Sequence, residues 1–256
     1  MPFTLAHPGA VVFIKNKHLN LSGLILGSMA PDFIYFMLFS PSSNLGHTIL
    51  GSIIVNIPLC FLLNYIYHKY IKDPFILNLP NFISKYYWSF LYTRNNVTNI
   101  KEVVVFMYSS VIGMITHVFL DSFTHKTGYF VLKLNFLRQT IDLLGHKIYV
   151  YKILQHGGTI LGFIIILIFL YKMKERKLSL DVSIKNKFIY HIIAILVGTV
   201  VMLSSYIAFS DSFRIGRIVV SFINALFLGY LASSIFYRNN YNISKYKICI
   251  QNKKNI

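Results

Sequence analysis

Long apolar runs are the feature of this sequence that most constrains its fold. A helix that crosses a membrane needs about 20 mostly apolar residues, and runs of that kind follow one another along the chain. The candidate spans are 21–39, 48–67, 103–121, 158–172, 189–209 and 217–236. The first contains Pro31 beside Asp32, and the fourth is short. We therefore predict an all-α fold, a polytopic transmembrane helical bundle of five or six spans.

The composition agrees with a membrane protein and argues against other classes. Of the 256 residues, 55% are hydrophobic and 13% are charged, whereas soluble domains carry about 25% charged residues. The net charge of +17 would also suit a nucleic-acid-binding protein, but the basic residues lie between apolar runs, so no nucleic-acid partner is expected. Cys60 lies in an apolar run and Cys249 in the basic tail, so we expect neither a disulfide partner nor a thiolate metal site.

The positions of the basic residues indicate how the chain crosses the membrane. With six spans, 18 of the 25 Lys and Arg fall on the side that includes both termini, and 7 fall on the other side. Cytoplasmic loops are enriched in Lys and Arg, so this arrangement places both ends in the cytoplasm. The segment 122–157 opposes it, because that segment is long and basic and yet lies on the outer side.

Two carboxylates lie at positions where an acidic side chain is energetically unfavourable in a membrane protein. Asp32 lies inside an apolar run and Asp121 ends another, and a carboxylate at such depth costs at least a few kcal/mol unless it is paired or metal-bound. His117, Asp121 and His125 follow at intervals of four residues, which places them on one helix face. His117 and Asp121 can therefore hold one cation. The two histidines are about 12 Å apart along the helix axis, so Asp121 between them suits a bridging ligand in a two-metal site.

Three further histidines are candidates for the same site. His47 opens the second span and His156 precedes the fourth, and in the six-span arrangement both lie on the outer side with His125. His7 stands near the start of the chain, where Thr4 could cap a short amphipathic helix. Imidazole and carboxylate ligands without thiolates favour zinc, followed by manganese or iron.

Each candidate also has a structural interpretation. His117 and Asp121 could form a buried ion pair that only joins helices, and His156 could belong to a polar helix start. If 21–39 spans fully, His7 lies on the cytoplasmic side, away from the other candidates. Either this segment is re-entrant with a break at its proline, which leaves five spans, or His7 is not a ligand.

The order of these residues resembles that of a known family. The motifs are Met1-Pro-Phe-Thr-Leu-Ala-His7-Pro-Gly-Ala, Gly27-Ser-Met-Ala-Pro31-Asp32-Phe, Gly46-His47-Thr, His117-x3-Asp121-Ser-Phe-Thr-His125 and Tyr151-Lys-Ile-Leu-Gln155-His156-Gly. Together they resemble a bacterial integral-membrane family of unknown function. That family is similar to inner-membrane proteins regarded as metal-dependent hydrolases, and more distantly to zinc-dependent phospholipase C. The resemblance covers most of residues 1–172.

The distant resemblance implies a ligand set. By order, the counterparts of the zinc ligands are His7, Asp32, His47, His117, Asp121 and His125, with Asp121 shared between ions. The soluble enzymes complete their last zinc with a further His and a Glu four residues on. Here Val150 stands at that spacing after His146, and His156 is the candidate substitute. The chain thus divides into a phospholipase-C-like metal-site core in 1–172, additional transmembrane helices in 173–238 and a basic tail in 239–256.

These expectations combine into a functional hypothesis. The first hypothesis is a membrane-embedded hydrolase in which zinc, as two or more divalent ions, activates a water molecule to attack a phosphoester. A site at the membrane interface suits a phospholipid or lipid-phosphate substrate, and membrane lipids are the expected partners. The resemblance implies a multi-pass protein of the bacterial inner membrane. The alternatives are an ion- or proton-coupled transporter, because intramembrane Asp and His also build ion pathways, and a non-catalytic membrane scaffold.

Overall fold

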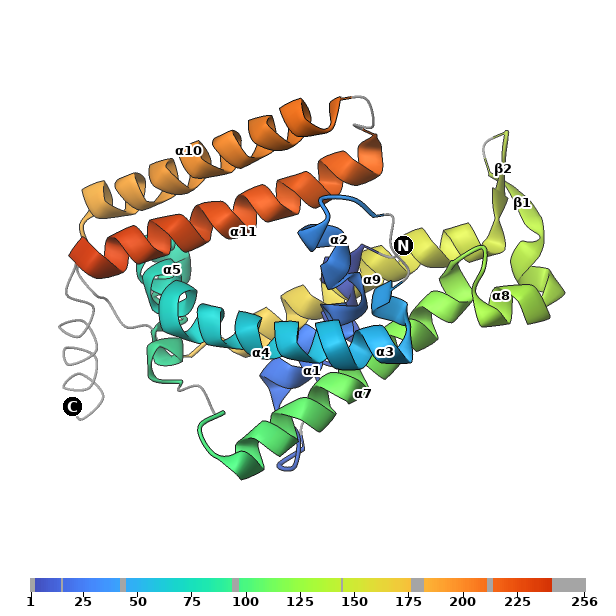
Figure 1. Cartoon of the computed structure of the whole chain (residues 1–256), viewed down its shortest axis with the longest axis horizontal. Helices are drawn as coiled ribbons and strands as arrows, with labels where there is room; N and C mark the ends of the chain where they lie inside the picture. Colours follow the sequence, from blue (N-terminus) through green and yellow to red (C-terminus); the bar gives the residue numbers. More distant parts are fainter. Residues whose placement is uncertain are drawn as a thin grey trace. The chain divides into compact units, whose positions relative to one another are not determined.

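The computed structural model describes residues 3–14, 16–41, 45–93, 97–143, 145–175, 182–210 and 214–240. This part of the chain is almost entirely helical, with one short two-stranded hairpin (Figure 1), and so has the predicted all-α class. It divides into two compact units whose segments interleave along the sequence. Unit 1 comprises Met1–Ile34, Asn44–Leu62 and Asn96–Lys172, and unit 2 comprises Tyr35–Ser43, Leu63–Asn95 and Met173–Ile256.

Unit 1 combines an N-terminal segment with two long helices. The N-terminal segment holds the 3₁₀ helix η1 (Thr4–Ala10), α1 (Leu21–Met29) and the 3₁₀ turn η2 (Ala30–Asp32), which leads into α2 (Phe33–Met37). The long helices are α7 (Ile100–Thr124) and α9 (Val150–Lys172). The chain between them forms α8 (Tyr129–Lys133), η7 (Asn135–Arg138), β1 (Thr140–Leu143) and β2 (His146–Tyr149). The remaining elements are η3 (Leu45–His47), α3 (Ile49–Gly51), the π-helical turn η4 (Ser52–Asn56) and the first part of α4 (Ile57–Ile66).

Small residues allow α1 to pack directly against α7. A Cβ added at Gly27 would lie 2.1 Å from the carbonyl oxygen of Ser110, and one at Gly113 would lie 2.4 Å from the carbonyl oxygen of Leu24. Glycines and serines at such positions let two helix backbones approach closely. The start of α1 is held as well, because the N–H of Asn20 donates to Ser109 Oγ at 2.9 Å. This packing fixes the turn that follows α1 beside α7.

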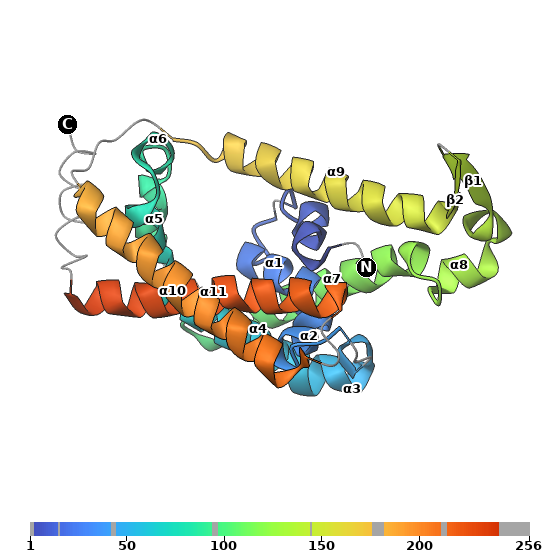
Figure 2. The same cartoon turned by 90° about the horizontal axis from the view of Figure 1, so that it is seen from above.

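Unit 2 is a second helical assembly with its own core. The helices α10 (Ile184–Ala208) and α11 (Ile215–Asn240) pack against each other (Figures 1 and 2). Hydrogen bonds between hydroxyl groups join them at Ser205–Ser221, 2.6 Å, and at Tyr190–Ser234, 2.8 Å. The unit also contains the π-helical turn η5 (Tyr67–Ile71), α5 (Lys72–Asn78), α6 (Asn81–Ser84) and the 3₁₀ helix η6 (Trp88–Tyr92). Its core consists of Ile76, Leu77, Trp88, Leu91, Val182, Tyr190 and Tyr237.

Five helices are long and apolar enough to cross a membrane. They are Ile49–Asn78, Ile100–Lys133, Val150–Lys172, Ile184–Ala208 and Ile215–Arg238, and each contains one of the predicted runs or most of it. The run 21–39 is different, because it forms only the shorter apolar segment Leu21–Met37 and tightens into a 3₁₀ turn at Ala30–Asp32. Pro31 in this turn lacks a backbone N–H and cannot continue the α-helical ladder. Among the described residues, five candidate spans are therefore present rather than six.

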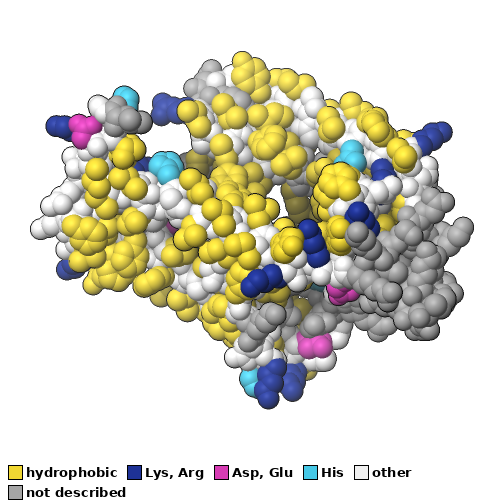
Figure 3. All heavy atoms as spheres, turned by 180° about the vertical axis from the view of Figure 1, so that it is seen from behind, with side chains coloured by type: hydrophobic (Ala, Val, Ile, Leu, Met, Phe, Trp, Pro, Cys, Tyr) yellow, Lys and Arg dark blue, Asp and Glu magenta, His cyan; other side chains and the backbone are white. Residues whose placement is uncertain are grey.

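The surface of the long helices suits a lipid environment. Hydrophobic side chains cover much of the face drawn in Figure 3. On α10, for example, Ile195, Leu196 and Val200 are each more than half exposed. An apolar surface of this extent is unfavourable in water and indicates contact with a membrane or with other protein. Five apolar helices with exposed apolar faces indicate a multi-pass membrane protein. The predicted basic tail lies outside the described residues from position 241 onward.

Candidate metal centre

Helix α7 and the residue that caps its C-terminal end supply three of the candidate ligands. A capping box fixes the start of this helix, with Asn99 accepting from the N–H of Glu102 and Glu102 reaching back to the N–H of Asn99. From there the helix runs without interruption to Thr124, so His117 and Asp121 stand one turn apart on its buried face. His117 is fully buried. The predicted shared helix face is thus present for His117 and Asp121, whereas His125 is the C-cap residue after the helix and has extended backbone angles.

One oxygen of Asp121 belongs to a four-residue group of potential ligands. Asp121 Oδ2 lies 3.3 Å from His117 Nε2 and 3.8 Å from His47 Nε2. Asp32 Oδ1 lies 3.8 Å from each of the same two nitrogens. Two ligand atoms that each lie about 2.0–2.1 Å from a tetrahedral zinc are about 3.4 Å apart. The group therefore has the spacing of a set of atoms that surrounds one ion.

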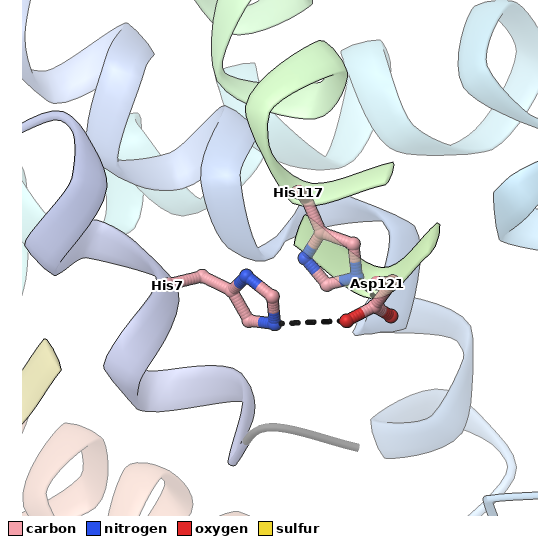
Figure 4. Close-up of side chains that lie close together, drawn as sticks. All are labelled: His7, His117 and Asp121. Carbon is pink, nitrogen blue, oxygen red and sulfur yellow. Dashed lines mark ion pairs between the residues drawn. The ribbon is translucent and has the colours of Figure 1, made fainter. Parts of the chain in front are cut away.

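The other oxygen of Asp121 faces a different pair of histidines. Asp121 Oδ1 lies 3.5 Å from His7 Nε2 and 3.5 Å from His125 Nδ1. Figure 4 shows the ring of His7 directed at this oxygen, and the ring of His7 stacks on that of His117 with centroids 3.9 Å apart. The two oxygens of one carboxylate thus face two histidine pairs. A bridging carboxylate has this placement.

His7 reaches the site because the N-terminal helix lies close against α9. A Cβ at Gly9 would be 2.7 Å from the carbonyl oxygen of Gly162, and the N–H of Phe3 donates to Thr159 Oγ1 at 3.1 Å. His7 is almost fully buried. Burial, together with the neighbouring His117, lowers the pKa of His7 from 6.5 to about 3. The ring is therefore neutral at physiological pH and keeps a lone pair for a metal ion.

Asp32 and His47 meet the other ligands through two tight turns. Asp32 ends η2 and is fully buried. His47 ends η3, and the residue before it approaches η2 so closely that a Cβ at Gly46 would lie 2.1 Å from the carbonyl oxygen of Pro31. Asn56 supports the same turn by donating from Nδ2 to the carbonyl oxygen of Gly46 at 2.7 Å. The turn at Pro31 therefore places Asp32 beside His47.

Two hydrogen bonds hold the ligands in orientation. Thr4 Oγ1 donates to Asp32 Oδ2 at 2.6 Å, which leaves Asp32 Oδ1 directed at the histidines. His117 Nδ1 lies 2.8 Å from the carbonyl oxygen of Ser28. As the donor of that bond, Nδ1 carries the proton and Nε2 carries the lone pair that faces the site. Partners of this kind fix the orientation and tautomer of metal ligands in proteins.

Several buried polar atoms at the centre of the cluster have no hydrogen-bond partner among the described residues. They are both ring nitrogens of His7, Asp32 Oδ1, His117 Nε2 and Asp121 Oδ1. Buried polar atoms are nearly always satisfied, because an unsatisfied one costs about 1–3 kcal/mol. Except for His7 Nδ1, each of them is one of the potential ligand atoms described above. Divalent cations would provide a partner for all of these potential ligand atoms, so the residues fit a metal centre.

The structure brings six of the seven predicted ligands together. His7, Asp32, His47, His117, Asp121 and His125 form the cluster, with His125 at its more exposed edge, where its Nδ1 also lies 3.1 Å from the carbonyl oxygen of Asp121. His156 is exposed on α9, and its buried neighbour is Gln155. The two groups of potential ligands found in the described residues are His7 with His117 and Asp121, and Asp32 with His47 and His117, and neither includes His125 or His156. His146 is exposed in β2 and also stands outside those groups.

Two supporting residues were not predicted for this role. Thr4 was expected to cap a helix, but Phe3 occupies the cap position and Thr4 instead binds Asp32. The signal for Thr4 was its position three residues before His7, because residues i and i+3 share a face in a 3₁₀ helix. Ser28 acts through its backbone carbonyl, so the type of side chain at this position could not indicate the role.

Replacement of Thr4 by valine tests the hydrogen bond to Asp32. Valine has nearly the same shape but cannot donate, so Asp32 loses the contact that orients it. We expect metal affinity to fall by about 10–100-fold, the usual effect of losing such a partner, with little change in thermal stability. The measurement is titration of metal-free protein with zinc. Thr127→Val, at an exposed position in the same unit, is the control, and equal affinities in the two variants would contradict the assigned role.

Comparison with known proteins identifies a family but no function. A family model described as a domain of unknown function, DUF4184, matches residues 1–235. The match extends beyond residue 172, where the resemblance seen in the sequence ended, and takes in α10 and most of α11. No curated protein and no solved structure gives a significant match to the chain.

Proposed function

We propose that this chain, which belongs to the DUF4184 family, is a membrane-embedded metal-dependent hydrolase of phosphoesters. The observation that carries the proposal is the position of Asp121. Its two oxygens face different histidine pairs at 3.3–3.8 Å, and one of those pairs is completed by Asp32. A buried ion pair that only joined helices would need one histidine and one carboxylate. Four histidines and two carboxylates from separate segments exceed that requirement.

The ligand set supports a pair of divalent ions, and zinc is the first candidate. One ion would be held by Asp32, His47, His117 and Asp121. The second would be held by Asp121 and His7, and His125 would join them once its Nδ1 is released from the carbonyl oxygen of Asp121, which leaves room in the coordination of this ion for water or substrate. Imidazole and carboxylate ligands suit zinc, with manganese or iron as alternatives. Two divalent ions at such a site supply a nucleophilic water at neutral pH and a clamp on the oxygens of an in-line displacement.

The chain's own residues contribute preorganisation. Thr4 and the carbonyl of Ser28 hold Asp32 and His117 in the orientation that ligation requires. His7 is neutral at physiological pH, so it needs no deprotonation before it binds an ion. His125 and His47 are the partly exposed ligands, with side chains 28% and 26% exposed, and His125 stands where α7 ends. Substrate would therefore approach from the side of these two histidines.

The surroundings favour a substrate carried by a lipid. Three of the ligands lie within the candidate span Ile100–Lys133, and Asp121 and His125 are near the end of the long helix α7. The basic residues of the chain would attract anionic head groups. Phospholipids and lipid-linked phosphates combine a phosphoester with a membrane anchor. We propose this substrate class for the site.

Metal removal and restoration test the proposal. Protein purified in detergent is expected to contain about two divalent ions per chain and to hydrolyse bis(p-nitrophenyl) phosphate or a short-chain phospholipid. A chelator should remove both the ions and the activity, and added zinc or manganese should restore them. Full hydrolytic activity in a folded protein that contains no transition metal would overturn the proposal.

A matched pair of histidine variants separates the site from the rest of the protein. His47→Ala removes a ligand nitrogen and should lower both metal content and hydrolysis. His191→Ala removes a histidine of unit 2 that contacts Tyr230 and the carbonyl oxygen of Asn78, and should leave metal content and turnover unchanged. If Asp121→Asn abolished an ion flux in liposomes without loss of metal, the transporter alternative would be favoured instead.

A further inference from the structure

The segment between α7 and α9 forms a small folded platform at one end of unit 1. Figure 2 shows α8, β1 and β2 together beyond the C-terminal end of α7 and the N-terminal end of α9. A core of its own holds it there, made of Val131, Leu137 and Tyr151. Phe123 at the end of α7 stacks on Phe130 of α8 with ring centroids 4.2 Å apart. We refer to the described residues 126–143 and 145–152 as the platform.

The hairpin of the platform has one mainly apolar face that the described residues leave largely exposed. In the antiparallel register, Ile141 stands opposite Ile148 and Leu143 opposite His146, and opposed residues share a face. Ile141 is 47% exposed and Leu143 is 52% exposed. An isolated two-stranded hairpin is at best marginally stable in water. We therefore expect this face to contact an apolar surface.

Other apolar side chains of the platform are exposed as well. They are Tyr129 and Leu132 of α8, Leu134, Phe136 of η7, and Tyr149 of β2, each 37–63% exposed. Aromatic and aliphatic side chains mixed with lysines are typical of segments that lie in the membrane interface. The candidate spans on either side of the hairpin, Ile100–Lys133 and Val150–Lys172, keep the platform close to the bilayer.

The platform carries an excess of positive charge, which suits contact with lipid headgroups. Its basic residues are Lys126, Lys133, Arg138, Lys147 and Lys152, against the single acidic residue Asp142. With five spans, this segment and its five basic residues lie on the side opposite segments 68–102 and 172–188, which carry five and six Lys and Arg. The rule that favours basic residues in the cytoplasm therefore does not account for its charge. Attraction to anionic lipid headgroups does.

We propose that the platform docks on the anionic lipid headgroup layer, with the apolar face of the hairpin inserted below the phosphates and its basic residues in contact with them. This binding surface is distinct from the metal centre and does not require hydrolysis. It lies at the end of α7 that carries Asp121 and His125. The platform would therefore gather anionic phospholipids beside the site.

Opposite faces of β1 supply an internal control for a labelling experiment. Leu143→Cys places an environment-sensitive fluorophore on the apolar face, and Asp142→Cys places it on the other face. Cys249→Ser removes the cysteine of the tail, and the native Cys60 is buried. The labelled full-length proteins are reconstituted in nanodiscs of phosphatidylcholine, with or without phosphatidylglycerol, and nitroxide-labelled lipids serve as quenchers.

We expect lipid nitroxides to quench the label at 143 several-fold more strongly than the label at 142, and phosphatidylglycerol to increase that quenching. Changing Lys133, Arg138 and Lys147 to glutamine should remove the increase and leave metal content unchanged. Equally weak quenching at 142 and 143 in every nanodisc would show that the hairpin stands in water and would overturn the proposal. Strong quenching at 143 that is the same with and without phosphatidylglycerol would overturn the role of anionic lipid. Metal content, measured on the same samples, keeps these outcomes separate from the proposed hydrolase function.

Discussion

Asp121→Asn is expected to remove both metal ions and to reduce hydrolysis by more than about 100-fold, the upper range seen when even a supporting partner of a ligand is lost. Asparagine keeps the size of the side chain but loses the negative charge that two divalent ions share. It also replaces one of the two oxygens with a nitrogen that cannot ligate. Because one oxygen faces His117 and His47 and the other faces His7, either orientation of the amide damages one of the two groups.

The measurement is metal content by elemental analysis together with the rate of phosphodiester hydrolysis. Asp142→Asn is the matched control, because Asp142 is exposed in the hairpin of the same unit and its Oδ1 accepts from the N–H of Gly145 at 3.0 Å, which asparagine can also do. The control should retain about two ions per chain. Full metal content in Asp121→Asn would exclude Asp121 as a bridging ligand and leave it as an ion-pair partner only.

The helical part of the site was predictable because helix periodicity is local. The interval of four residues in His117, Asp121 and His125 was enough to place them on one face, and the apolar run around them predicted burial. The structure has His117 and Asp121 on this face, whereas His125 follows the helix as its C-cap residue and contacts Asp121 from there. Five of the six predicted spans are also present as long apolar helices. Both features depend on neighbours a few residues away.

The long-range part of the site was not predictable from local pattern. Hydropathy treats 21–39 as a span, because counting apolar residues ignores the break at Pro31. The order of residues shared with a known family suggested that His7, Asp32 and His47 belong to one site, but no spacing argument could bring them together. Thr4 was misassigned for the same reason, because its partner Asp32 is 28 residues away.

The direction in which His156 faces on its helix was not predictable from the sequence. The sequence places a histidine beside Gln155, but periodicity in a mostly apolar segment does not indicate which of two adjacent residues faces inward. Successive residues point about 100° apart on a helix of 3.6 residues per turn. In the structure Gln155 is buried and His156 is exposed. His156 therefore lies on the exposed side of α9, one residue from a buried position.

Gly27→Ala is expected to destabilise the protein by about 1–3 kcal/mol, the usual cost of overpacking, and to weaken metal binding at the same time. The added Cβ would lie 2.1 Å from the carbonyl oxygen of Ser110, so α1 must move away from α7. That movement shifts the carbonyl of Ser28, which contacts His117 Nδ1, and the turn that carries Asp32. A single methyl group outside the ligand set would thus disturb two ligands.

Gly157→Ala is the matched control for this prediction. Gly157 is also helical, but a Cβ there would meet no atom within 4 Å. The control should be neutral or more stable by up to about 1 kcal/mol, because alanine favours helix more than glycine does. Thermal unfolding in detergent and zinc titration measure the two effects. If Gly27→Ala matched the control in both, the close packing of α1 on α7 would not be what positions Asp32 and His117. If it lost stability but kept zinc affinity, the turn at Pro31 and the hydrogen bond from Thr4 would suffice to hold Asp32 without the support of α1.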